Sequence, residues 1–272
     1  MDELAEKQFS GPITVFQERR LPEKAIPTGY AALIGAYALH VPLPRTLSAI
    51  GPKHRLYQAD GWAIYTPRHA PSPDIEGHLT FALKYEGLDL TVLKSLFRSI
   101  GPTPIEAMVR AAPTGSYARR AWFLYEWLLG EQLDLPSAER GGYAKVVDTE
   151  QQYGSGGTNS ARHRVKNNLP GTPAFCPMVF RTEKMRAYQG RDFAAKARAI
   201  IADVSGDILA RTAAFLLLKD SKSSFAIEGE HPPQERIQRW GRAIGEAGKR
   251  PFDLVELLRL QRIVIGDARF VQ

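Results

Sequence analysis

The segment from residue 116 to residue 129 constrains the fold more than any other part of the sequence. It has the length of a helix, and Gly130 follows it where a helix C-cap is expected. Apolar side chains occur on nearly every side of such a helix, including the aromatic residues Tyr117, Trp122, Phe123, Tyr125 and Trp127. A helix that is apolar all round is buried, so the segment predicts the centre of a globular core. The alternative is a platform on which single-stranded nucleic acid stacks, with Arg119 and Arg120 beside the rings.

The composition is that of a globular protein. Hydrophobic residues make up 44% and charged residues 24% of the 272 residues, enough chain for one large domain or two ordinary ones. The longest apolar stretches, residues 31–39 and 213–218, are shorter than the roughly 20 residues of a membrane span. The acidic N-terminus lacks the basic-then-apolar pattern of a signal peptide, and the only cysteine, Cys176, cannot form an internal disulfide. These features favour a cytoplasmic protein without a membrane partner.

Helices dominate the elements predicted for the first half of the chain. Apolar periodicity and flanking glycines predict helices over residues 29–39, 79–85, 90–100 and 105–111. Asp60-Gly61, between two aromatic and apolar runs, predicts a β-hairpin over residues 55–66. Residues 1–27 show no sustained period and are expected to form an extended arm. The expected fold class is therefore mainly α, with this one small hairpin.

The C-terminal third is expected to be helical. Glycine and proline runs make residues 131–190 a loop-rich link, which predicts an N-terminal domain over residues 1–190 and a helical region over residues 191–272. Helical spacing then predicts an inward face made of Phe193, Ala197, Ile200, Val204 and Ile208. A break in the helix is expected at residues 221–224. Pro232-Pro233 and Pro251 begin two further helices, the last with an inward face of Leu254, Leu257, Leu258 and Ile265.

The formal net charge of +7 raises the question of a nucleic-acid partner, because clustered cations attract phosphate backbones. Two clusters stand in the sequence: Arg119 with Arg120, and Arg162 with Arg164 and Lys166. Elsewhere basic and acidic residues are mixed along the chain. The clusters define a candidate basic patch, and the alternative is an ordinary solvated surface.

No catalytic or metal-binding motif is found in the sequence. The six histidines never form a His-x-x-x-His pair, and there is no nucleophile elbow or P-loop. One short segment stands out, in which Ser224 and Glu228 lie four residues apart and Gly229 follows. On a helix this hydroxyl and this carboxylate project from one face. The purely structural interpretation makes Ser224 an N-cap, Glu228 a solvated acid and Gly229 a left-handed C-cap.

The string Ser224-x-x-x-Glu228-Gly229 resembles the inhibitory motif of Fic-family AMP-transferases, Ser/Thr-x-x-x-Glu-Gly/Asn. The similarity extends to the flanks of that motif, namely residues 220–223, 240–241 and 256–261. It covers mainly residues 190–272, which implies that the C-terminal third is the start of a Fic fold. The segments that look like an N-terminal extension of one subset of the family are residues 117–127 and 167–173. The resemblance implies that Glu228 pairs with an arginine of the catalytic motif and obstructs the γ-phosphate of ATP, while Ser224 orients the helix.

Fic catalysis requires the string His-x-Phe-x-Asp/Glu-Gly-Asn-Gly-Arg, and no histidine of this sequence begins it. The resemblance therefore implies the front part of a longer Fic protein: a regulatory and target-selecting portion that itself holds no catalytic residue, metal or cofactor. ATP and Mg²⁺ are implied for the full-length protein, with a Fic catalytic domain in cis or in trans and a protein as substrate. Two alternatives stay open. One is a nucleic-acid-binding regulator that uses the basic clusters, and the other is an antitoxin-like inhibitor that acts in trans on a Fic partner.

Overall fold

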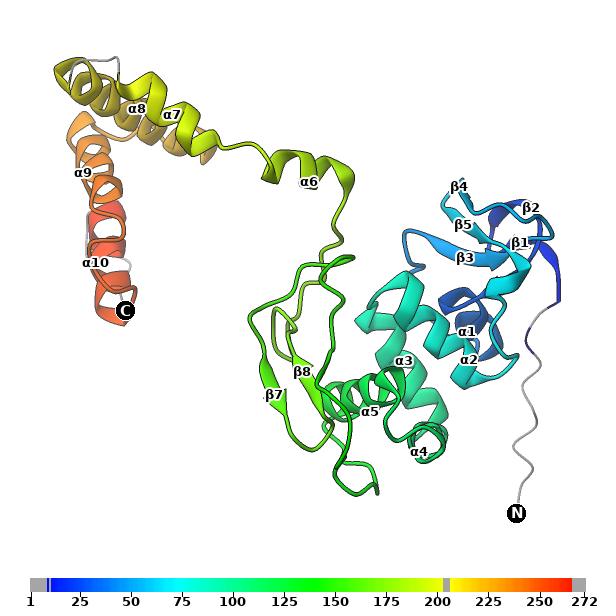
Figure 1. Ribbon diagram of the computed structural model, residues 1–272. Coiled ribbons are helices and arrows are strands. Elements are labelled where there is room, and N and C mark those ends of the chain that lie inside the picture. Colours follow the sequence, from blue (N-terminus) through cyan, green and yellow to red (C-terminus); the bar gives the residue numbers. More distant parts are fainter. Residues whose placement is uncertain (1–8, 10, 203–205, 266–272) are drawn as a thin grey trace. The chain divides into compact units, whose positions relative to one another are not determined.

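The computed structural model describes residue 9 and residues 11–202 and 206–265, and it divides into two compact units, Met1–Arg186 and Ala187–Gln272 (Figure 1). This division lies four residues before the boundary predicted at residue 190. Helix makes up 46% and strand 15% of the structure. Helix therefore prevails, as expected, but the first unit is a mixed α/β structure and "mainly α" is only a rough description of it.

A five-stranded sheet forms one layer of the first unit, with the strand order β1-β2-β3-β5-β4. All pairs are antiparallel except β3 with β5. The strands are β1 (Ile13–Phe16), β2 (Arg19–Thr28), β3 (Leu47–Ile50), β4 (Tyr57–Ala59) and β5 (Trp62–Tyr65). The expectation of an extended arm over residues 1–27 is thus wrong for its second half, which forms β1 and β2. Pro22 and Pro27 break the alternation that signals a strand, yet their fixed φ is compatible with an extended backbone.

The predicted hairpin is confirmed. Strands β4 and β5 pair antiparallel, with Ala59 opposite Trp62. Asp60 has a φ of 52° and Gly61 a φ of 78°, and two successive positive values are what a tight type I′ turn requires. Trp62 and Ile64 of β5 are fully buried, so the hairpin is anchored in the core.

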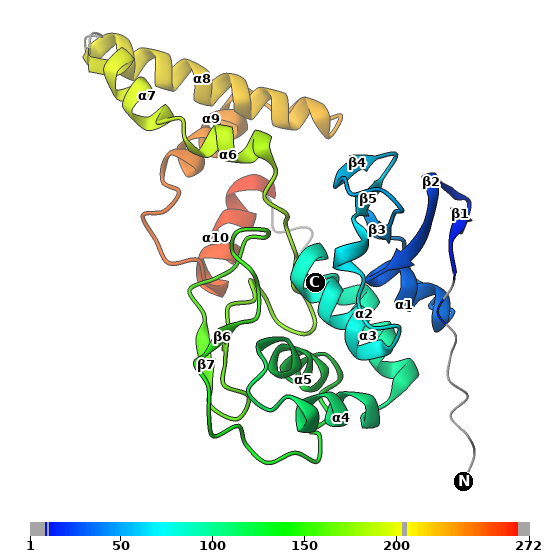
Figure 2. The same cartoon turned by 45° about the vertical axis from the view of Figure 1, so that its right-hand side comes forward.

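Helices form the second layer of the first unit. Both views place α1 and α2 beside the sheet and α3 to α5 beyond them (Figures 1 and 2). The helices are α1 (Tyr30–Ala36), the short 3-10 helix η1 (Pro67–His69), α2 (Ile75–Phe81), the π-helical turn η2 (Ala82–Glu86), α3 (Leu90–Ile100), α4 (Thr103–Ala111) and α5 (Ser116–Leu129).

Helix α5 lies in the core of this unit, as predicted. Trp122 and Tyr125 are each only 1% exposed, and Gly130 ends the helix in the left-handed conformation. The alternative of a stacking platform is wrong, because rings enclosed by the core offer no face to a nucleobase.

The stretch predicted as a loop-rich link is an integral part of the first unit. It forms a small sheet of β6 (Ala144–Lys145), β7 (Thr158–Ser160) and β8 (Val165–Asn167), which contacts α5. The buried Asn168 side chain accepts a hydrogen bond from the backbone N–H of Val147 at 2.8 Å and donates one to its carbonyl at 3.0 Å. The Asn168 amide thus makes the two hydrogen bonds to Val147 that the backbone of a neighbouring strand would make.

The second unit consists of helices, and α6 leads into it from the first. The helices are α6 (Glu183–Gln189), α7 (Phe193–Ala202), α8 (Gly206–Ile227), α9 (Gln234–Gly245) and α10 (Leu254–Ile265). Helix α9 packs against α8 and α10. The break expected at residues 221–224 does not occur, because α8 runs through these residues to Ile227. The Ser221 and Ser224 hydroxyls donate to carbonyls one turn earlier in the same helix.

The inward faces predicted for the second unit are wrong among the side chains that the structure describes. Ile200 is 69% and Ile208 is 56% exposed, and Leu254 is 69% exposed. Val204 and the side chain of Ile265 lie outside the described residues. Spacing identifies the residues that share a helix face, but it does not say whether anything covers that face. In the described ranges, no helix is both long and apolar enough to cross a membrane.

Candidate functional site

The Ser224–Glu228–Gly229 motif lies at the C-terminal end of α8. Ser224 sits in the last turn, and its Oγ donates a hydrogen bond to the carbonyl of Asp220 at 3.0 Å. The interpretation of Ser224 as the N-cap of a short helix is therefore wrong, because Ser224 lies inside a helix of 22 residues. The predicted C-cap is confirmed, since Gly229 has a φ of 71°.

Two backbone hydrogen bonds fix the geometry of this end. The N–H of Gly229 donates to the carbonyl of Ala226 at 3.1 Å, and the N–H of Glu230 donates to the carbonyl of Phe225 at 2.9 Å. This pair of bonds is the Schellman motif, which needs a residue in the left-handed conformation at the Gly229 position. The backbone of Glu228, between these bonds, is consequently held in one place.

The carboxylate of Glu228 is exposed, and no residue in the described ranges donates a hydrogen bond or forms a salt bridge to it. The next acid, Glu230, differs in this respect, because it pairs with Arg236 at 3.0 Å. A negative charge at the C-terminal end of a helix opposes the helix dipole and costs about 0.3–1 kcal/mol. The position of Glu228 is therefore not explained by the stability of α8.

Helix α8 carries apolar residues on two opposite faces. One face packs on α9, where Phe225 is buried beneath the guanidinium of Arg236, 5.1 Å from the ring centre. The other face is exposed and holds Ile208, Phe215, Leu216 and Ile227. A helix that is apolar on both sides is typical of the middle of a core. The exposed face is thus suited to a further protein layer.

The cluster of Arg119 and Arg120 lies inside the first unit. Arg119 donates to the carbonyls of Gly142 at 2.8 Å and Arg164 at 2.7 Å. Arg120 donates to the carbonyls of Val146 at 3.0 Å and Leu83 at 3.2 Å. Both guanidinium groups hold loops and helices together, so the prediction of a basic patch is wrong at these two positions.

The three cations of the second cluster are half-buried, and both arginines bind within the first unit. Arg162 forms a salt bridge with Glu126 at 2.9 Å, and Arg164 donates to the carbonyls of Ala138 and Glu139 at 3.3 and 2.6 Å. Lys166 is half-buried in β8. The clusters therefore do not form an exposed basic face, which removes the observation that favoured a nucleic-acid partner.

Glu126 is the centre of a polar network that the sequence did not predict. It accepts hydrogen bonds from Trp122 Nε1 at 2.7 Å, from His163 Nε2 at 2.8 Å and from Arg162. Burial by itself would raise the pKa of Glu126, but hydrogen bonds from Arg162 and Trp122 bring it below the ordinary value. Ser160 Oγ lies 2.7 Å from His163 Nδ1. This Ser–His–Glu series resembles a nucleophile with its base, but Arg162 neutralises the acid, and we interpret the network as a clamp between α5 and the β7–β8 turn.

A second partly buried acid, Glu86, ends the π-helical turn. Its Oε2 accepts the N–H of Tyr30 at 2.7 Å, while Oε1 is buried without a hydrogen-bond partner among the described residues. Burial raises the pKa of Glu86 to about 7, against the opposing effect of the Tyr30 N–H.

This acid should make the stability of the first unit depend on pH. Because the pKa of Glu86 is raised by folding, its contribution is complete below the ordinary carboxyl pKa and is lost as the pH rises through about 7. We expect a loss of about 1–3 kcal/mol in unfolding free energy between about pH 5 and pH 8. Glu86→Gln, which stays neutral, should remove most of that fall in urea titrations at several pH values. An unchanged pH profile would contradict this role.

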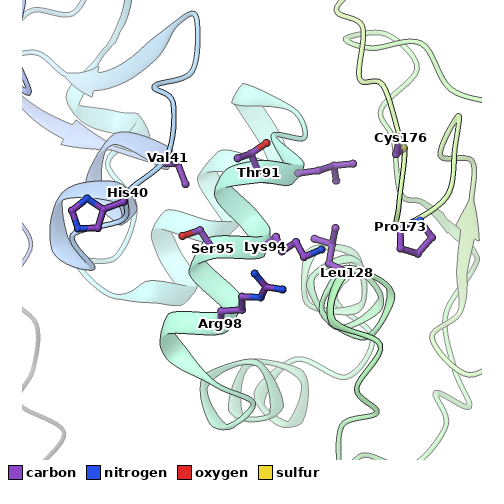
Figure 3. A pocket seen from close by; sticks show the side chains of 10 residues that line it. His40, Val41, Thr91, Lys94, Ser95, Arg98, Leu128, Pro173 and Cys176 are labelled. Atoms are coloured by element: carbon purple, nitrogen blue, oxygen red, sulfur yellow. The ribbon is translucent and has the colours of Figure 1, made fainter.

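A groove of about 440 Å³ lies beside α3 (Figure 3). Lys94 and Arg98 project from α3 toward Leu128, with Pro173 and Cys176 across from them. Ser95 points to the other side, where His40 and Val41 lie. No local pattern in the sequence predicts this groove, because its walls come from segments far apart in the chain.

In the parts of the chain that the structure describes, no group of three or more His, Cys, Asp or Glu side chains is arranged to hold a metal ion. Comparison with protein-family models, with curated proteins and with solved structures finds no match to this chain.

Proposed function

We propose that this chain is the regulatory and target-selecting portion of a Fic-family protein adenylyltransferase, which transfers AMP from ATP to a protein hydroxyl in the cytoplasm. In this proposal Glu228 is the inhibitory residue. The observation that carries it is the exposed, unpaired carboxylate of Glu228, held at the end of α8 by the hydrogen bonds around Gly229.

The chemistry of such inhibition follows from charge pairing. A carboxylate without a partner attracts a guanidinium, and a paired guanidinium is no longer available to a phosphate. Because the backbone on both sides of Glu228 is hydrogen-bonded, the carboxylate is presented from a fixed position. The Ser224 hydroxyl donates to the carbonyl of Asp220 within the same helix. ATP and Mg²⁺ would be bound by the Fic catalytic domain, and no residue of this chain is assigned to them.

The exposed apolar faces of the second unit support a docked catalytic domain. Phe215 is 65% and Ile227 is 83% exposed on α8, and Val255 is 76% exposed on α10. Side chains of this kind are usually removed from water by a protein partner when they recur on neighbouring helices. The domain that covers them can belong to the same polypeptide or to a separate chain, in which case this chain acts in trans.

The docking is tested by association with a Fic catalytic domain supplied as a separate polypeptide. We expect the two to copurify, and we expect Phe215→Asp to weaken the complex at least about tenfold, because it places a charge in an apolar contact. Lys219→Asp is the matched control on α8, since Lys219 is exposed and polar already. No complex, or equal weakening by both variants, would contradict the docking.

The isolated chain should transfer no AMP. The catalytic string of the Fic family is absent from its sequence, so neither a base nor a phosphate-binding loop of that kind is provided. Incubation with labelled ATP and Mg²⁺, followed by detection of labelled protein, checks this. Label on the chain itself, or on an added protein, would contradict the proposal that transfer belongs to another domain.

A further inference from the structure

The outer face of α3 presents two cations, Lys94 and Arg98. Val92, Leu93, Leu96 and Phe97 bury the inner face of this helix. Lys94 and Arg98 lie on the outer face, four residues apart, where like charges repel. Arg98 is in the last turn, where the helix dipole favours a cation, but Lys94 lies in the middle of the helix.

These cations also lack counter-ions. In the described ranges, neither Lys94 nor Arg98 forms a salt bridge or hydrogen bond, and Lys94 is half-buried. The residues that line the groove include no aspartate or glutamate. A half-buried ammonium beside a guanidinium, with no acid nearby, leaves a local excess of positive charge that an anion would neutralise.

On the side of the groove where Lys94 lies, the rest of the wall is apolar. Leu90 and Leu128 line it, and Pro173 and Cys176 lie across from the lysine and arginine on the opposite loop (Figure 3). That loop is held by backbone hydrogen bonds between Thr172 and Phe175, at 2.9 and 3.0 Å. The whole groove, including the part lined by His40 and Val41, has a volume of about 440 Å³, which falls in the range of small-molecule sites. The groove therefore has a positively charged end and an apolar wall, which together fit a ligand with an anionic group and an apolar body.

We propose that this groove binds a phosphomonoester whose organic body is apolar, with the phosphate between Lys94 and Arg98 and the body against Leu90, Leu128 and Pro173. The half-buried Lys94 and the exposed Arg98 together match the two charges of a phosphomonoester better than the single charge of a carboxylate. Arg98 supplies a planar pair of donors and Lys94 a compact charge, a combination suited to phosphate oxygens. The inference concerns the first unit and goes beyond the proposed function.

The test uses phenyl phosphate as the probe, titrated into the full chain by calorimetry at about 0.15 M salt. Inorganic phosphate tests the charge without the apolar body, and benzoate tests the body with a single charge. We expect phenyl phosphate to bind at least about tenfold more tightly than either. Lys94→Gln and Arg98→Gln should each weaken it about tenfold. Leu90→Ala should weaken phenyl phosphate but leave inorganic phosphate unchanged.

Arg68→Gln and Lys84→Gln are the matched controls, because both cations are exposed in the same unit and neither lines the groove. Circular dichroism confirms that each variant is folded. Equal affinity for the three anions, equal weakening by the control variants, or no saturable binding in the millimolar range would overturn the proposal. Tighter, steeply salt-dependent binding of a single-stranded oligonucleotide that is lost in Lys94→Gln would replace it with a nucleic-acid surface.

Discussion

Glu126→Ala is expected to lower the free energy of unfolding of the first unit by about 2–4 kcal/mol, because it removes one partner of a partly buried ion pair and leaves several donors without their acceptor. The side chain of Arg162 is 23% exposed and that of His163 8% exposed, so neither recovers full hydration when the carboxylate is lost. Trp122 Nε1 and the N–H of Leu133 also lose their acceptor. Several buried donors are left unsatisfied by this one substitution.

Urea unfolding followed by near-ultraviolet circular dichroism measures this loss. Glu76→Ala is the control, since Glu76 is an exposed acid in the first turn of α2 and its removal should cost less than about 1 kcal/mol. The lowered pKa of Glu126 adds a pH signature: the stabilisation is present above the ordinary carboxyl pKa and disappears as the pH falls through the lowered value. A loss for Glu126→Ala no larger than that of the control would show that the network does not hold α5 to the β7–β8 turn.

Local signals in the sequence were sufficient for part of the fold. Helices α3 and α5 begin and end at the predicted residues, because each has strong apolar periodicity and a terminal glycine. The Asp60-Gly61 turn likewise specifies its own hairpin. The pairing of β2 with β3 is different, since Thr28 meets Ser48 across a helix and a loop. Pairing between strands that are far apart in the chain cannot be predicted from a short segment of sequence.

The positions of charged residues in the sequence were the least reliable basis for predicting a binding surface. Arg119 and Arg120 are adjacent in the sequence and suggest a surface, yet both guanidinium groups end among backbone carbonyls in the interior. The carbonyls that receive them come from loops whose paths the sequence does not reveal. The groove beside α3 was missed for the same reason, because Lys94 and Pro173 meet only in the folded chain.

At the candidate regulatory site, the sequence predicted the helix end correctly but not its context. Gly229 is the left-handed C-cap, as expected, whereas Ser224 belongs to a helix that begins at Gly206. The break expected at residues 221–224 does not occur, although serine has a poor helix propensity. Contacts of Phe225 and Ser221 with α9 outweigh that propensity.

Glu228→Gly should leave stability nearly unchanged and should raise activity. In the isolated chain it should change the free energy of unfolding by no more than about 1 kcal/mol, because Glu228 is exposed and its removal relieves an unfavourable charge at the end of α8 while glycine disfavours the helix. In a polypeptide that also carries the Fic catalytic domain, the substitution should free the arginine for the γ-phosphate. We expect AMP transfer to rise at least about tenfold, which corresponds to about 1.4 kcal/mol of barrier.

The most direct test of the regulatory role is the rate of AMP transfer by that longer polypeptide, compared between the unchanged protein and Glu228→Gly, with Glu230→Gly as the control. Glu230 lies two residues further on and pairs with Arg236, so its loss removes an acid from the same helix end without removing the proposed inhibitor. The account predicts a rise of at least about tenfold for Glu228→Gly and little change for Glu230→Gly. No rise for Glu228→Gly, together with a collapse of thermal stability in the isolated chain, would show that Glu228 is a structural residue and that this helix end does not regulate AMP transfer.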